Sequence, residues 1–140
     1  MSIIIIIIIV IVIKDDIITG VIDFDKMHFD WRVVDVAHAI SSLYINLENG
    51  HNDKLLLIKT FLNGIGKVIK YTKNEIISLP DIIKLVIVKL FESAVCHSKI
   101  KPNILEYSIQ RIKNFSILMT FLDDNMNYFL SDICEGLHEN

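Results

Sequence analysis

The sequence predicts a mainly α-helical domain that begins with a β-hairpin, and a change of residue pattern along the chain supports this. Residues 1–25 are rich in β-branched side chains, which favour strands because their stiff side chains fit a pleated sheet. From Val33 onward apolar residues recur every three to four positions, the period of an amphipathic helix. A length of 140 residues suits about one domain. We therefore expect a single domain with a hairpin over residues 1–25 and a helical lobe over residues 30–140.

The predicted hairpin consists of two apolar runs with a polar turn between them. All eleven residues from Ile3 to Ile13 are β-branched, and Ile17–Ile22 is a second strand-like run. We expect the two runs to pair antiparallel around the turn at Lys14–Asp16. Residues from Ile3 to about Ile9 have no evident partner in this arrangement. An uncharged run with open strand edges favours cross-β stacking, so we expect self-association through Ile3 to Ile13.

The helical lobe is expected to contain four helices and a short fifth one. The expected ranges are 33–47, 55–65, 74–97, 102–122 and 126–133. Asp30 is placed to cap the first helix and Gly50 to end it. Pro80 predicts a break in the third helix, with a fresh start at Asp81. The stretch Ile82–Phe91 is apolar on nearly all sides, which is typical of a helix in the middle of a bundle.

Composition and charge argue against several classes of function. The chain carries 14 Lys and Arg against 17 Asp and Glu and has no basic stripe, so nucleic acid is not an expected partner. Cys96 and Cys134 lack the spacing of a zinc site and are too few for a disulfide framework. The run of eleven is shorter than the ~20 apolar residues that span a bilayer, and it does not resemble a signal peptide. We expect a cytoplasmic protein that does not contact a membrane.

The densest group of residues that could carry chemistry follows the second apolar run. Asp23 and Asp25 are two positions apart and would share one face of a regular strand. Carboxylates at the mouth of an apolar hairpin suit a hard cation such as Mg²⁺. The alternative is that these acids only end the strand and lead into the next helix. His38 is expected to be a packed or partly exposed helix residue, and Cys96 to be packed.

Two segments of this region read ITGVIDFD at residues 18–25 and DWRVVDVAHA at residues 30–39. Their order resembles the aminoglycoside phosphotransferase and choline kinase-like family of small-molecule kinases. FLNGIGKV at 61–68 and LPDIIKL at 79–85 look like less specific helical phrases of the same family. The resemblance covers roughly residues 14–133, and its specific part is confined to 18–39. It implies the truncated C-terminal lobe of a protein-kinase-like fold.

The resemblance also implies a reaction and roles for three acids. The family transfers the γ-phosphoryl group of ATP, held with Mg²⁺, to a hydroxyl of a small-molecule acceptor. Asp23 corresponds to the metal-binding aspartate of the family and Asp25 to an auxiliary metal ligand. Asp35 looks like the buried aspartate that supports the catalytic loop. An acid favoured by the dipole of a helix's first turn explains Asp35 equally well.

The same resemblance implies parts that the sequence lacks. The family's catalytic loop, His-Gly-Asp-x-x-x-x-Asn, would fall on Ile3–Val10, yet no Asp, Asn or His occurs before Asp15. The glycine-rich nucleotide loop and its lysine have no counterpart either. We therefore expect no catalytic residue and no turnover, which makes ATP and Mg²⁺ binding by this chain doubtful. The alternatives are a helical module that binds a small molecule or a protein, and a coding remnant without function.

Overall fold

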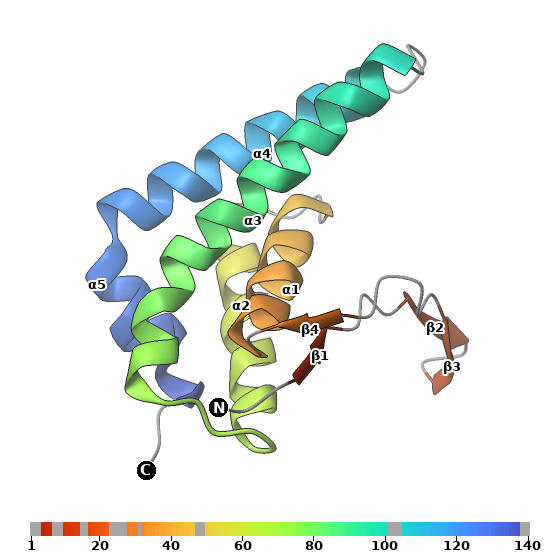
Figure 1. Ribbon diagram of the computed structural model, residues 1–140. Coiled ribbons are helices and arrows are strands. Elements are labelled where there is room, and N and C mark those ends of the chain that lie inside the picture. Colours follow the sequence, from red (N-terminus) through yellow and green to blue (C-terminus); the bar gives the residue numbers. More distant parts are fainter. Residues whose placement is uncertain are drawn as a thin grey trace.

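The computed structural model describes the backbone of residues 4–6, 10–14, 17–22, 28–30, 32–46, 50–100 and 105–137, with side chains from residue 32 onward except at 97, 98, 100 and 105. Its helices are α1 (Arg32–Asn46), α2 (His51–Gly66), α3 (Lys73–Ile100), α4 (Leu105–Asp124) and α5 (Met126–Tyr128). A π-helix, η2 (Phe129–Ile133), and a 3₁₀-helix, η3 (Glu135–Leu137), follow (Figure 1). The mainly helical fold class is confirmed.

Four short strands precede the helices: β1 (Ile4–Ile6), β2 (Val10–Lys14), β3 (Ile17–Ile22) and β4 (His28–Asp30). β2 and β3 pair antiparallel, with Lys14 opposite Ile17 and an irregularity in the register after Val12. β1 pairs antiparallel with β4, and Ile5 lies opposite Phe29. The expectation that the start of the isoleucine run lacks a backbone partner is therefore wrong for β1. The sequence does not reveal this pairing, because three residues are too short to show a strand pattern.

The helices pack around α1, which contacts α2, α3 and α4. α3 and α4 run side by side in opposite directions and extend together beyond the ends of α1 and α2 (Figure 1). The C-terminal turns η2 and η3 pack against α2. The largest fully buried side chains come from all four long helices and η2: Tyr44, Phe115, Phe129, Ile40, Ile58, Leu62, Ile76, Leu79, Ile83, Ile87 and Leu118.

α3 continues through Pro80, so the predicted break at Pro80 and the fresh start at Asp81 are wrong. A proline inside a helix costs about 3 kcal/mol because it removes one backbone hydrogen bond and crowds the preceding turn. Leu79 and Ile83, on either side of the proline, are fully buried against the core. Packing along both halves of α3 therefore offsets the local cost and keeps the helix continuous.

The expectation that Ile82–Phe91 is buried on nearly all sides is also wrong. Leu85 is 57%, Val88 54% and Phe91 43% exposed, whereas Val86 and Ile87 are buried. The reason is that α1 and α4 cover only one side of α3 in the described part of the chain. The predicted role of Gly50 also differs from the structure. Gly50 does not end α1 but is the N-cap residue of α2, where its carbonyl oxygen accepts a hydrogen bond from the backbone amide of Lys54.

Candidate functional site

The predicted metal ligands Asp23 and Asp25 lie outside the described residues. The backbone on either side is described, with β3 ending at Ile22 and β4 beginning at His28. Among the described residues, no group of three or more His, Cys, Asp or Glu side chains could hold a metal ion. The magnesium site therefore stays a prediction for the short segment between β3 and β4.

The other candidates from the sequence lie on helices. Asp35 is in the first turn of α1 and is half-buried, as is His38 one turn later. Cys96 is exposed on α3, so the expectation that it is packed is wrong. The buried cysteine is Cys134, and burial raises the pKa of its thiol to about 12. A thiol in this state is not a nucleophile at neutral pH, which leaves Cys134 a packing role.

A bidentate ion pair joins the start of α1 to the start of α3. Arg32 donates from Nε to Oε1 of Glu75 and from Nη2 to Oε2, both at 2.6 Å. The guanidinium carbon of Arg32 also lies 4.9 Å from the ring centroid of Tyr71, a cation–π distance. The hydrogen bonds from Arg32 hold the pKa of Glu75 at about 2, so this carboxylate is ionised at any physiological pH.

Glu75 caps α3 at the same time. Its Oε2 accepts the backbone amide of Thr72 at 2.8 Å, while the amide of Glu75 donates to Oγ1 of Thr72 at 3.3 Å. This reciprocal arrangement is a capping box, and the pattern Thr-x-x-Glu is its sequence signal, which the analysis of the sequence missed. All of these contacts hold the carboxylate in place. The pair is therefore a structural clamp for the point where the chain enters α1, and it is not a reactive acid.

A groove of about 440 Å³ runs between α3 and α4. Its walls are mainly apolar, and the lining residues are Ile87, Val88, Phe91, Ile112, Phe115, Ser116, Met119, Thr120 and Asp123. The carboxylate of Asp123 is hydrogen bonded to the ammonium group of Lys84. Apolar walls with a few polar groups at one end are typical of sites for small molecules, and the volume fits that class.

A second hollow, of about 370 Å³, lies beside the start of α2 and is bordered by His51. Nδ1 of His51 is 2.5 Å from the hydroxyl of Tyr44, and its ring meets Phe121 edge-on with centroids 5.0 Å apart. The ammonium group of Lys54 lies 4.9 Å from the Tyr44 ring centroid, and burial lowers the pKa of Lys54. The ring of His51 is therefore held by its contacts with Tyr44 and Phe121. His51 has no signal in the sequence, since nothing there places it beside Tyr44.

The described helices contain no segment long and apolar enough to cross a membrane. Comparison with known proteins gives no match: no family model, curated protein or solved structure corresponds to this chain.

Proposed function

We propose that this chain derives from a small-molecule phosphotransferase lobe, holds Mg²⁺ only weakly at Asp23 and Asp25, and does not catalyse phosphoryl transfer. The observation that carries the proposal is the order of elements around these acids. The first five residues of ITGVIDFD belong to β3, which pairs with β2, and α1 begins with the arginine of DWRVVDVAHA. In the resembling kinases, carboxylates that follow such a strand hold the metal that bridges the phosphates of ATP.

The described contacts support this proposal by fixing where α1 begins. Arg32 is bound bidentately by Glu75, so the helix start cannot drift relative to α3. The acids at 23 and 25 are then seven to nine residues from an anchored point. Phosphoryl transfer depends on positioning and on neutralisation of charge. Two carboxylates alone leave most of the Mg²⁺ coordination shell to water and provide no group that orients an acceptor hydroxyl. As a relative of ATP-dependent enzymes, the chain would work in the cytoplasm.

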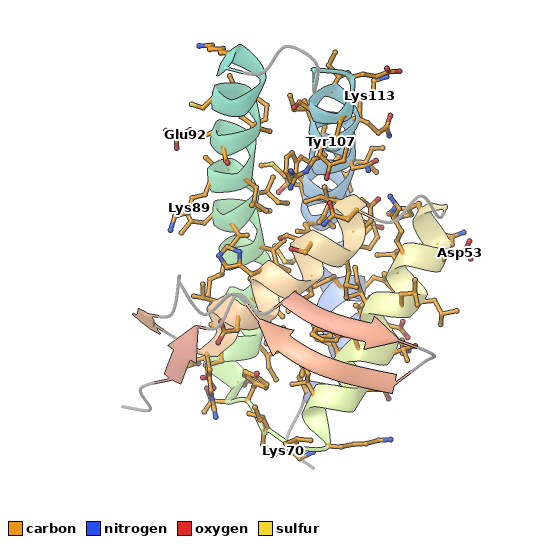
Figure 2. All side chains as sticks on the ribbon, turned by 90° about the vertical axis from the view of Figure 1, so that its right-hand side faces the viewer. Asp53, Lys70, Lys89, Glu92, Tyr107 and Lys113 are labelled. Carbon is orange, nitrogen blue, oxygen red and sulfur yellow. The ribbon has the colours of Figure 1, made fainter. Side chains whose placement is uncertain are left out.

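Metal binding tests the first half of the proposal. Titration with Mn²⁺, followed by water proton relaxation, should give a loose site that Asp23→Asn weakens further. Asp53→Asn is the matched control, because Asp53 is an exposed acid on α2 (Figure 2). A tight site that is unaffected by Asp23→Asn would remove the proposed ligand.

An activity assay tests the proposal that the chain does not catalyse phosphoryl transfer. We expect no ATP-dependent phosphorylation of aminoglycosides, choline or homoserine, because loss of a general base alone costs ~10²- to 10⁴-fold in rate. Activity above a heat-inactivated control that disappears with Asp23→Ala would show that the chain is an active kinase.

A second candidate function is a helical module that binds a small apolar molecule, and the groove between α3 and α4 favours it. Ser116 lines this groove, so Ser116→Trp should fill it and reduce the fluorescence enhancement of an apolar dye such as anilinonaphthalene sulfonate. Gln110→Trp, at an exposed position on the same helix, is the control. Equal dye binding by both variants would exclude the groove as the site.

A further inference from the structure

The loop that joins α2 to α3 is basic and carries two exposed apolar residues. Val68 is 84% exposed, more than any other large apolar side chain in the described part of the chain, and Ile69 beside it is 37% exposed. Lys67 and Lys70 flank this pair, and Lys73 follows at the start of α3; all three lysines are exposed. We call the segment from Lys67 to Lys73 the basic tip. It lies at one end of the helical part, where Lys70 is labelled (Figure 2).

Both ends of the basic tip are fixed to the helices. The backbone amides of Val68 and Ile69 each donate to the carbonyl oxygen of Ile65 at 2.8 Å, which closes the last turn of α2. At the other end Tyr71 is 3% exposed, and its ring lies against the guanidinium group of Arg32. The apolar pair therefore stays outside the core, because moving it inward would unwind the end of α2 or release Tyr71.

The positive charge of the basic tip is not compensated within the described part of the chain. The segment holds three lysines and no acid, and none of these lysines takes part in an ion pair there. Acids of the neighbouring elements are engaged by other bases. Glu75 is bound by Arg32, and Asp132 and Glu135, on the turns that pack against α2, are bound by Lys59. The basic tip therefore presents three free cations around an apolar pair.

We propose that the basic tip binds the surface of a membrane that contains anionic lipids. Val68 and Ile69 enter the headgroup region, and the flanking lysines contact the negative charges of the lipids. An exposed apolar loop end favours a lipid surface over a protein partner, because a bilayer yields to it whereas a protein needs a matching pocket. Apolar insertion and positive charge act together, since either signal alone gives only marginal binding. The sequence predicted no membrane contact because it was searched for segments that span or enter a bilayer, whereas this contact is peripheral.

Flotation of the full chain with lipid vesicles tests the proposal and separates bound protein from any aggregate. Vesicles of equal parts phosphatidylcholine and phosphatidylserine should bind the chain at least about tenfold better than pure phosphatidylcholine, because each lysine near an anionic surface contributes about fivefold. Added salt should release the protein. No binding to the anionic vesicles, or equal binding to both kinds, would overturn the proposal. Binding to soluble polyglutamate without binding to vesicles would also overturn it, since an acidic protein would then be the partner.

Two matched pairs of variants locate the contact. Lys70→Gln should weaken binding to the anionic vesicles about fivefold, whereas Lys113→Gln, an exposed lysine at the opposite end of the molecule, should not (Figure 2). Val68→Ser should weaken it at least about fourfold, the contribution of one buried methylene group, and Val88→Ser on α3 is its control. All four side chains are exposed, so unchanged circular dichroism is expected. Equal effects within either pair would overturn the proposal, because the contact would then lie elsewhere, for example on the isoleucine run.

Discussion

The contact between the end of α2 and the C-terminal 3₁₀-helix leaves no room for a side chain at Gly66. An added Cβ there would lie 1.7 Å from the carbonyl oxygen of Gly136 and 2.6 Å from its carbonyl carbon. Both are backbone atoms of η3, which packs along α2 and cannot rotate away as a flexible side chain would. Gly66→Ala must therefore push η3 off α2.

Gly64, two residues earlier in α2, offers a matched control. It is exposed, and an added Cβ meets nothing within 4 Å. Alanine is favoured over glycine inside a helix by roughly 0.5–1 kcal/mol, so Gly64→Ala should stabilise the protein by about that amount. Overpacking against a fixed neighbour costs about 3 kcal/mol, so Gly66→Ala should destabilise it by about that amount. The two variants carry the same substitution in the same helix and should differ by about 4 kcal/mol.

Urea denaturation followed by far-ultraviolet circular dichroism measures this difference directly. Gly136→Ala provides a second view of the same contact, because its Cβ would lie 2.7 Å from the Cα of Asn63. It should therefore destabilise the protein as well. Equal free energies of unfolding for Gly64→Ala and Gly66→Ala would refute the reasoning, since they would mean that η3 does not rest on α2 in solution.

Two further predictions concern titration and thiol reactivity. Hydrogen bonds from Arg32, together with those from Thr72, lower the pKa of Glu75 from 4.5 to about 2. The contribution of these hydrogen bonds to the free energy of unfolding is therefore fully present above pH 4.5 and is lost as the pH falls toward 2. It amounts to about 2 kcal/mol after allowance for partial solvent screening. The free energy of unfolding of Glu75→Gln should vary less over this range than that of the exposed control Glu92→Gln; identical pH profiles would contradict the clamp. Cys96 is exposed and Cys134 buried, so Ellman's reagent should titrate one thiol in the native state and two in urea. Two fast thiols in the native protein would contradict the burial of Cys134.

Local signals in the sequence predicted the helices well where they did not depend on distant neighbours. The spacing of apolar residues and the nearby glycines located α2, and the two acids at 123 and 124 located the end of α4. The predicted break at Pro80 was wrong because it considered only the local cost of a proline inside a helix. The burial of Leu79 and Ile83, which offsets this cost, is visible only in the packed structure. The exposed side of α3 was missed for a related reason. An apolar stretch indicates that burial would be favourable. It does not show which neighbouring helices are available to cover the stretch.

The polar contacts were the least predictable part of the candidate site. Arg32 and Glu75 are 43 positions apart, and nothing in the sequence pairs them. The capping box that prepares Glu75 for this role is visible in the sequence, yet it does not indicate that a second helix uses the same carboxylate. Distant pairing of this kind depends on how α1 and α3 cross, which periodicity does not determine.

The distribution of these contacts limits where chemistry can take place in the described helices. Glu75 binds Arg32 and caps α3, Asp132 binds Lys59, and Asp123 binds Lys84. Each of these acids joins elements that are distant in sequence, so each is committed to holding the helices together. An acid engaged in this way accepts a metal or a proton only by giving up a stabilising contact. Any metal or phosphate chemistry in the described helices therefore depends on acids outside these ion pairs.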